Sequence, residues 1–499
     1  MKKINCATFV DGEAKRVEVE SSFVKALPSF SIVGLASNSI LEARDRVKSA
    51  LTSIDYRFPP LKITINLSPS DIKKSGSHFD LCIALSLALQ KEDISFGDYF
   101  VFGELGLDGR VKDTSSIFPL ILSLKEKIDD LKVVIPKDSV KKVSKIPNLK
   151  IYYVESLKEA IEFFKDGVKK EAKSSTIEAK YIKKDKKYYY LEDFALDFLD
   201  VKGQEVAKRA ALISAAGMHN ILFEGSPGCG KSMISKRVRY ILPPMSLEEI
   251  LEVAKVESLD KKEPLFKPLR PFRSPHHSST KASIFGGGSN SAKIGEVALS
   301  HRGILFFDEL PHFSKHILEA LREPLEDRKI LISRVNSKIE YKTDFMFIGA
   351  QNPCPCGNLL SKTKECRCSD VEIQRYRNRL SEPFLDRIDI YVQMSEISKD
   401  DKPSKSSKEM FEDVLKAFEF RLDRGQKVFN SRLENQELQK YCILDEEAKD
   451  ILDRAIDRFS LSQRSINKIK KVSRTIADLD KSEFITKSHI LEALSFRRR

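Results

Sequence analysis

One stretch of eight residues, Gly225 to Ser232, has the residue types and spacing needed to bind a nucleotide. It reads G-S-P-G-C-G-K-S and matches the phosphate-binding pattern G-x-x-x-x-G-K-[ST] at every fixed position. An apolar run at 221–223 predicts a buried strand before it, and helical spacing at 233–242 predicts a helix after it. A loop between a strand and a helix presents backbone N–H groups to phosphate. The residues expected to bind the nucleotide are Gly225, Ser226, Pro227, Gly228, Cys229, Gly230, Lys231 and Ser232, with Lys231 on the β- and γ-phosphates and Ser232 on Mg²⁺.

Two carboxylates, Asp308 and Glu309, directly follow a second apolar run at 304–307. A buried strand ending in this order brings the Asp to Mg²⁺ and the Glu to the attacking water. A core strand capped by acidic residues is the alternative, and the glycine-rich loop upstream favours nucleotide hydrolysis over it. A further apolar run, 345–350, leads to Asn352, whose amide is placed to orient the attacking water, unless it only ends the strand.

Two arginines have the surroundings expected of groups that stabilise charge on a transferred phosphate. Arg387 lies between carboxylates on an otherwise apolar turn. A guanidinium is always charged and binds phosphate oxygens in pairs, so Arg387 suits an arginine finger that enters the site of a neighbouring subunit. An ion pair within its own subunit is the alternative. Arg464 opens a helical pattern, from which it could reach back to the γ-phosphate.

Four of the eight cysteines lie within fifteen residues, and this clustering favours a metal over a disulfide framework. Four thiolates at this spacing can close a tetrahedral site, so we predict structural zinc, with free thiols or a single disulfide as the alternatives. The cysteines concerned are Cys354, Cys356, Cys366 and Cys368. The adjacent His276 and His277 predict no zinc site, because neighbouring side chains diverge and a third ligand is lacking nearby.

We expect the 499 residues to form four regions, whose helices and strands position the residues named above. Alternating apolar runs interleaved with helical patterns predict an α+β domain at 1–165, and a lysine-rich stretch predicts a basic linker at 166–192. An α/β ATPase domain is expected at 193–398, with the cysteine cluster as an insertion at 354–368. Residues 399–499 have helical spacing and predict a C-terminal helical domain.

Composition and charge indicate a globular protein and suggest what kind of partner it binds. The chain is 41% hydrophobic and 32% charged, which is typical of globular domains, and it has no apolar run near the ~20 residues of a membrane span. The N-terminus lacks the apolar core of a signal peptide, so we expect a cytoplasmic protein without a membrane partner. A net charge of +13 suits a polyanion such as DNA, although lysine is also abundant on solvated helices. Arg334 and Lys338, at the tip of two predicted strands, are candidate DNA contacts in a basic hairpin.

The first region contains two stretches, 27–35 and 74–81, that resemble the N-terminal domain of magnesium-chelatase-like ATPases. That domain is similar in fold to the proteolytic domain of Lon, which needs a Ser nucleophile and a Lys base. Laid against that pattern, the nucleophile position falls on His78 and the lysine position falls near Phe118. The resemblance therefore implies a non-proteolytic relative, and Ser77, one place from the nucleophile position, is a weak candidate for catalysis.

The order and spacing of all these motifs over nearly the whole chain resemble the ComM/YifB family of magnesium-chelatase-like competence ATPases. The resemblance implies an AAA+ P-loop ATPase core of the helix-2-insert type, a Lon-protease-like N-terminal domain and a C-terminal helical lid. It also implies a hexameric ring, assembled with ATP and DNA, that acts as a helicase and drives branch migration of recombination intermediates, notably in natural transformation. By the same resemblance Asp308 binds Mg²⁺, Glu309 activates water, Asn352 is sensor 1, Arg387 is the trans finger and Arg464 is sensor 2.

Two other functions share parts of these motifs. A protein-remodelling motor like the magnesium chelatase ATPase subunit has the same core, but that subunit lacks this N-terminal domain and the cysteine cluster. An ATP-dependent protease is disfavoured because neither residue of the Ser–Lys pair is present at its position.

Overall fold

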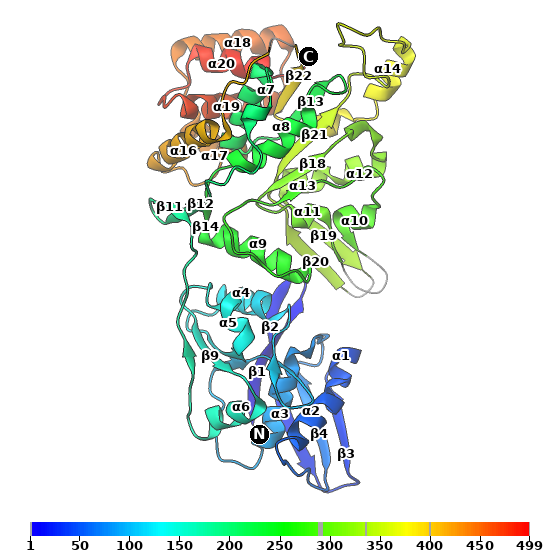
Figure 1. Cartoon of the computed structure of the whole chain (residues 1–499), viewed down its shortest axis with the longest axis vertical. Coiled ribbons are helices and arrows are strands. Elements are labelled where there is room, and N and C mark those ends of the chain that lie inside the picture. The colour runs from blue at the N-terminus through cyan, green and yellow to red at the C-terminus, as the bar shows by residue number, and fades with distance from the viewer. Residues whose placement is uncertain (1, 288–292, 335–336, 399–400, 499) are drawn as a thin grey trace. The chain divides into compact units, whose positions relative to one another are not determined.

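The computed structural model describes residues 2–287, 293–334, 337–398 and 401–498 (Figure 1). The chain divides into two compact units. Unit 1 consists of residues 1–178, 251–266 and 331–340, and unit 2 consists of residues 179–250, 267–330 and 341–499. Among the described helices, none combines the length and the apolar character needed to cross a membrane.

Unit 1 is built on an eight-stranded mixed sheet with the order β10-β9-β8-β5-β1-β2-β4-β3. The pairs β1–β2, β2–β4 and β9–β10 are antiparallel, and the other neighbouring pairs are parallel. The strands are β1 (Lys3–Val10), β2 (Glu13–Val24), β3 (Ser29–Val33), β4 (Lys62–Ser68), β5 (Tyr99–Val101), β8 (Lys132–Pro136), β9 (Lys150–Val154) and β10 (Glu171–Ala172), with a short pair β6 (Glu104–Leu105) and β7 (Val111–Lys112) apart from the sheet. The helices are α1 (Asn38–Leu41), α2 (Ala43–Thr52), α3 (Asp80–Ala88), α4 (Ile117–Lys125), α5 (Val140–Val143) and α6 (Leu157–Lys165).

The segment predicted to be a basic linker, 166–192, is more ordered than a solvated tether. It contains β10 and the hairpin of β11 (Lys180–Lys183) and β12 (Lys187–Tyr190), which pairs with β14 (Met245–Ser246). The segment is ordered because two of its tyrosines are buried, although lysines dominate its composition. Tyr188 and Tyr189 are buried, and the ring of Tyr188 packs edge-on against Phe418 at 5.1 Å between centroids.

Unit 2 contains a five-stranded sheet with the order β15-β18-β21-β13-β22, in which every neighbouring pair is parallel. The strands are β15 (Phe272–Arg273), β18 (Ile304–Phe307), β21 (Met346–Gln351), β13 (Ile221–Gly225) and β22 (Ile390–Met394). A parallel sheet is covered on both faces, so its strands are mainly apolar. Accordingly Leu222 and Phe223, neighbours on β13, belong to two different core clusters on opposite faces.

Helices cover both faces of this sheet. Helix α7 (Glu205–Gly217) precedes β13, and the segments between the strands contain α8 (Lys231–Val238), α10 (Lys281–Phe285), α11 (Glu296–Leu299), α12 (Lys315–Ala320), α13 (Arg322–Asp327), α14 (Asp370–Arg377), α15 (Glu382–Leu385) and the hairpin of β16 (Gly286–Gly287) with β17 (Lys293–Ile294). The same segments contain α9 (Leu247–Leu259) and the hairpin of β19 (Lys329–Arg334) with β20 (Ser337–Lys342), whose residues within 251–266 and 331–340 belong to unit 1.

The C-terminal region is helical, as predicted, and it shares a core with the sheet. Its helices are α16 (Ser407–Asp423), α17 (Asn435–Tyr441), α18 (Glu446–Phe459), α19 (Gln463–Leu479) and α20 (Lys487–Ser495), drawn in orange to red in Figure 1. Helix α7 packs against α16 and α19. Val414 and Val472 from these helices lie in the same buried cluster as Ile221 and Ile348 from the sheet. Movement of the helices relative to the sheet therefore requires this core to rearrange.

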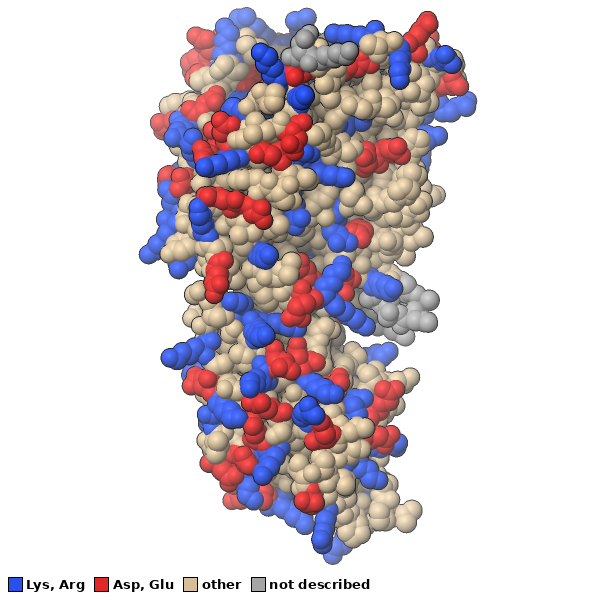
Figure 2. All heavy atoms as spheres, viewed as in Figure 1, with Lys and Arg blue, Asp and Glu red and all other residues tan. Residues whose placement is uncertain are grey.

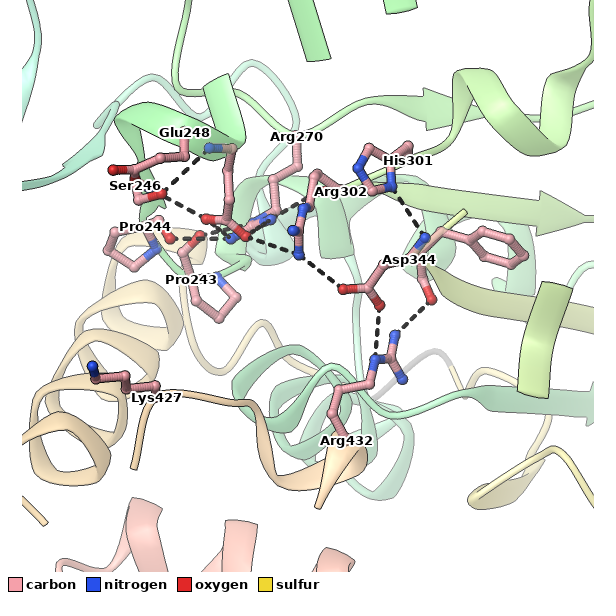
Figure 3. Close-up of polar contacts among 12 residues, drawn as sticks. Pro243, Pro244, Ser246, Glu248, Arg270, His301, Arg302, Asp344, Lys427 and Arg432 are labelled. Carbon is pink, nitrogen blue, oxygen red and sulfur yellow. Dashed lines mark hydrogen bonds and ion pairs between the residues drawn. The ribbon is translucent and has the colours of Figure 1, made fainter. Parts of the chain in front are cut away.

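A buried polar network also joins the C-terminal region to the sheet (Figure 3). The carboxylate of Asp344, just before β21, accepts hydrogen bonds from Arg302 at 2.9 Å and from Arg432 at 2.8 Å. Arg432 also donates to the carbonyl of Phe345 at 2.8 Å. Burial alone would raise the pKa of Asp344, but the charges of Arg432 and Arg302 lower it to about 2. The ionised carboxylate thus ties the start of β21 to the C-terminal helices.

Candidate active site

The predicted phosphate loop lies at the carboxyl end of β13 and leads directly into α8. Gly228 and Gly230 have φ values of 82° and 96°, a left-handed conformation that side chains other than Gly rarely adopt. A Cβ atom on Gly225 would lie 2.7 Å from the Cys229 sulfur, so this position also needs glycine. The strand, loop and helix predicted from the sequence are therefore present. The glycines of the motif are required either by a left-handed backbone or by the lack of space for a Cβ atom.

The side chains expected to bind phosphate and Mg²⁺ converge at this loop. The Lys231 ammonium donates to the carbonyls of Gly225 at 2.6 Å and Ser226 at 3.0 Å, and to the Asn352 side-chain oxygen at 3.1 Å. The Ser232 hydroxyl donates to the Asp308 carboxylate at 2.6 Å. The loop, β18 and β21 thus bring together four polar side chains from positions up to 121 residues apart.

Glu309, predicted to activate water, follows Asp308 in a left-handed turn with φ 51°. Its backbone N–H donates to the Asp308 carboxylate at 3.0 Å, and its own carboxylate is half-exposed. The imidazole Nδ1 of His277 lies 3.5 Å from that carboxylate. From sequence, His277 is notable only as a possible zinc ligand, because its contact with Glu309 depends on the pairing of β15 with β18.

The arginines predicted to stabilise phosphate charge, Arg387 and Arg464, lie at the amino ends of the central strands. We call this the amino edge of the sheet, and the end that carries the phosphate loop the carboxyl edge. In the register of β13 with β22, Ile221 is opposite Ile390 and Gly225 is opposite Met394. Arg387 precedes Ile390 and therefore lies at the amino ends of the strands, whereas the phosphate loop follows the carboxyl end. A five-residue parallel strand spans about 13 Å. Arg387 is therefore remote from the phosphate loop of its own chain.

Arg387 and Arg464 meet at one carboxylate, that of Glu326 near the end of α13. Arg387 Nη2 donates to one oxygen of Glu326, and Arg464 Nη2 donates to the other at 2.8 Å. The Arg387 side chain is 10% exposed and that of Arg464 is 43% exposed. Arg464, which the sequence predicts to reach a γ-phosphate, is thus held beside Arg387.

The backbone around Arg387 is fixed by side chains at the same edge. Asn220, just before β13, donates from its amide to the Arg387 carbonyl at 2.8 Å and accepts from the Phe347 N–H at 2.9 Å. Lys468 on α19 donates to the Ile388 carbonyl at 3.1 Å. These contacts hold the turn that carries Arg387 between the sheet and α19.

The four clustered cysteines form a compact group of thiols. Their sulfurs all lie within 4.8 Å of one another, and three of the separations are 3.4, 3.6 and 3.7 Å. A tetrahedral site with Zn–S distances of about 2.3 Å places its sulfurs about 3.8 Å apart, so this donor set fits zinc. Among the described residues, Cys354, Cys356, Cys366 and Cys368 are the one group of His, Cys, Asp or Glu side chains arranged to hold a metal.

This cysteine cluster lies directly beside the nucleotide loop. Gly357 has φ 80°, and a Cβ atom there would lie 2.6 Å from Pro227 of the loop and 3.8 Å from Asn352. Asn352 itself is two residues before Cys354. The cluster therefore supports both the loop and the amide that contacts Lys231, a role that the sequence spacing did not reveal.

The Lon-like positions in unit 1 do not form a Ser–Lys pair in the described structure. Ser77 donates its hydroxyl to the Glu104 carboxylate. His78 is buried between polar groups, with Nε2 2.9 Å from the Ala7 carbonyl and Nδ1 3.0 Å from the Ser116 hydroxyl, and burial lowers its pKa to about 4. Phe118, at the lysine position, is buried in α4. The absence of proteolytic activity in this domain stays a prediction.

The candidate DNA contacts Arg334 and Lys338 have side chains outside the described residues; their backbones belong to β19 and β20. Elsewhere, Figure 2 shows Lys and Arg interspersed with Asp and Glu on the face of the molecule that it presents. On that face the net charge of +13 is not gathered into one basic surface.

Comparison with known proteins identifies the family. The model of the magnesium chelatase subunit ChlI matches residues 197–402, and further ChlI models match residues 18–139 and, for its C-terminal part, residues 404–497. The chain is 36% identical to Competence protein ComM of Haemophilus influenzae over 97% of its own length and 95% of that protein. The chain belongs to the ComM/YifB family of magnesium-chelatase-like proteins.

Other members of the ComM/YifB family align over the same extent. The chain is 37% identical to the uncharacterized protein YifB of Escherichia coli, over 97% of its length and 94% of that protein. It is 32% identical to the uncharacterized protein Rv2897c of Mycobacterium tuberculosis, over 98% of its length and 96% of that protein. The family and the parallel central sheet together give an α/β AAA+ P-loop core, for which ATP and Mg²⁺ are the implied ligands.

Proposed function

We propose that this protein hydrolyses ATP with Mg²⁺ and uses the energy to move on DNA. The observation that carries the ATPase proposal is the convergence of Lys231, Ser232, Asp308 and Asn352 at the phosphate loop. In this proposal Lys231 binds the β- and γ-phosphates, Ser232 and Asp308 hold Mg²⁺, and Glu309 activates the attacking water. Catalysis comes from positioning and from stabilising the charge on the γ-phosphate.

The position of the arginines supports a site shared between subunits. Arg387 lies at the sheet edge opposite its own loop, so it can stabilise phosphate charge only at the loop of another copy. Arg464 shares its counter-ion Glu326, and we therefore assign both arginines to the neighbour's nucleotide. This arrangement requires a head-to-tail assembly, which forms a ring when the rotation between neighbours closes, and a hexameric ring is the form that the family resemblance implies.

DNA as the partner is supported by the relative named Competence protein ComM and by the net charge of +13. We propose a helicase or branch-migration motor that acts on recombination intermediates in natural transformation, with Arg334 and Lys338 in a DNA-contacting hairpin. The domains proposed for this motor are a Lon-protease-like N-terminal domain at 1–165, the connecting segment 166–192, a helix-2-insert ATPase domain at 193–398 and a helical lid at 399–499. The cysteine cluster is proposed to hold structural zinc that braces the nucleotide loop.

A protein-remodelling ATPase is the second candidate, because the matching family models are those of a magnesium chelatase subunit. Measuring ATP hydrolysis with and without single-stranded and branched DNA separates the two, with Lys231→Ala as the blank. A DNA motor should be stimulated by DNA, and the stimulation should fade as salt rises, because binding releases counterions. Hydrolysis that is indifferent to DNA at low salt would reject the DNA motor in favour of the remodelling ATPase.

A further inference from the structure

Glu326 occupies a position that neither the sequence motifs nor the proposed catalytic roles explain. It comes from α13, while its two partners come from the turn before β22 and from the first turn of α19. Each partner uses a different oxygen of the carboxylate, so the two guanidinium groups are neighbours in space. Glu326 is thus the point at which three elements, distant in sequence, meet at the amino edge of the sheet.

The charges around Glu326 show what the carboxylate does for the arginines. Lys468 lies one turn after Arg464 on α19, and burial lowers its pKa; the charges of Asp389 and Asp386 oppose this shift, and those of Arg464 and Arg387 add to it. Three cations therefore lie together. Burial alone would raise the pKa of Glu326, but the hydrogen bond and charge of Arg387, with the charge of Arg464, hold that pKa below its ordinary value. An ionised Glu326 offsets the repulsion that would otherwise drive the two arginines apart.

The contacts of Glu326 leave the arginines able to bind a second anion. A guanidinium group has five N–H donors. Arg464 uses Nη2 for Glu326 and remains 43% exposed. Arg387 uses Nη2 for Glu326 and Nη1 for the Pro383 carbonyl, and its side chain is only 10% exposed, with Nε buried and without a hydrogen-bond partner among the described residues. A phosphate group could therefore approach the pair from the side of Arg464 without displacing Glu326. Holding both arginines in advance also reduces the entropy lost when they bind that phosphate.

We propose that Glu326 is a positioning residue that holds Arg387 and Arg464 together as one unit for the triphosphate of a neighbouring copy of this chain. The inference rests on the proposed function, in which that neighbour's nucleotide is hydrolysed at its Lys231 loop. Glu326 does not touch the nucleotide; it acts through the two arginines.

The first test uses the full-length chain with Glu326→Gln, which keeps the size of the side chain and removes its charge. We expect kcat for ATP hydrolysis to fall at least tenfold, while the Kd of a fluorescent ATP analogue changes less than twofold. Asp327→Asn is the matched control, because Asp327 is the exposed next residue of the same helix, and it should hydrolyse ATP at the normal rate. Hydrolysis by Glu326→Gln at the normal rate would overturn the proposal.

Mixing variants tests whether Glu326 acts on a neighbour. Glu326→Gln binds nucleotide but presents a weakened arginine pair, whereas Lys231→Ala has an intact pair and no nucleotide. Each alone should be nearly inactive, and the mixture should recover hydrolysis. Combining Glu326→Gln with Arg387→Ala in one chain should cost less than the two separate losses together, because only Arg464 then remains to be positioned. A merely structural Glu326 would give no recovery on mixing, an additive loss in the double variant, and a lowered Tm.

A parallel mixture separates this inference from the proposed function. Arg387→Ala mixed with Lys231→Ala should also recover hydrolysis if the site is shared between chains. If that mixture stays inactive, the shared site and hence the proposed function fail. If it recovers while Glu326→Gln alone behaves as the normal chain does, only the role of Glu326 is rejected.

Discussion

The two edges of the central sheet hold different halves of the proposed catalytic machinery. At the carboxyl edge, Lys231, Ser232, Asp308 and Asn352 contact one another within a single chain. At the amino edge, Arg387 and Arg464 contact Glu326 and no part of that set. In the proposed function, the first edge binds the nucleotide and the second stabilises the charge that develops during its hydrolysis. On that proposal, binding is local to one chain, whereas hydrolysis needs a pair of chains.

The largest effect is expected from the carboxyl edge. Lys231→Ala removes the ammonium that contacts the loop and Asn352, so nucleotide binding and hydrolysis should both be abolished. Binding of a fluorescent ATP analogue measures this directly. Lys236→Ala, an exposed lysine on the same helix, is the control and should bind normally. Normal nucleotide affinity in Lys231→Ala would show that the carboxyl edge is not the binding site.

The next largest effect is expected at the amino edge, and it should be of a different kind. Arg387→Ala should lower kcat by roughly three orders of magnitude, the scale of an arginine finger, while nucleotide affinity stays within about twofold. Steady-state hydrolysis and equilibrium binding, measured on the same preparation, separate the two quantities. Arg377→Ala, an exposed arginine on α14, should change neither. If Arg387→Ala lost nucleotide binding and hydrolysis to the same extent, the proposed difference between the two edges would be wrong.

A smaller effect should show that the cysteine cluster supports the carboxyl edge. Gly357→Ala would place a Cβ atom 2.6 Å from Pro227 and displace the loop, so ATP affinity should fall about tenfold, or about 1.4 kcal/mol. Gly425→Ala is a matched control, because Gly425 has a similar φ of 77° but no atom within 4 Å of its Cβ position. Both variants carry the same backbone strain, and only the first should weaken binding. Equal affinities in the two variants would contradict the proposed support.

The smallest effect concerns stability rather than activity. Asp344 has a pKa of about 2 against an ordinary value of 3.8, so its ionised form stabilises the fold above about pH 4 and this stabilisation is lost as pH falls toward 2. Asp344→Asn should therefore lose about 2 kcal/mol at pH 7. Urea unfolding at pH 7 and near pH 2.5 measures the change, and the gap between variant and normal chain should narrow at the lower pH. A gap that is independent of pH would reject the ion-pair explanation.

Much of the carboxyl edge could be predicted from sequence, because its groups lie in short contiguous motifs. The loop at 225–232 and the acidic pair after 304–307 each carry their own spacing rule. Little of the amino edge could be predicted, because its contacts join single residues distant in sequence. Arg387 was found through its local surroundings, but Glu326 stands in an ordinary helix and only the fold shows that it holds two arginines.

Two further differences have similar physical causes. The hairpin within 180–190 was missed because lysines dominate the composition of this segment. Only two tyrosines, Tyr188 and Tyr189, become buried and anchor the strand that contains them. The contact of His277 with Glu309 was missed because β15 is only two residues long, too short to show strand periodicity. In each case the structure depends on a contact between residues distant in sequence, and the spacing of neighbouring residues does not predict such a contact.

The separation of the two edges has a consequence for how the enzyme responds to its own abundance. If every working site takes its loop from one chain and its arginines from another, an isolated chain can hold ATP without consuming it. Hydrolysis per chain should then rise with protein concentration and level off once assembly is complete. Dilution alone would then stop hydrolysis, and any partner that gathers chains would restore it, so ATP would be hydrolysed mainly where chains have been brought together.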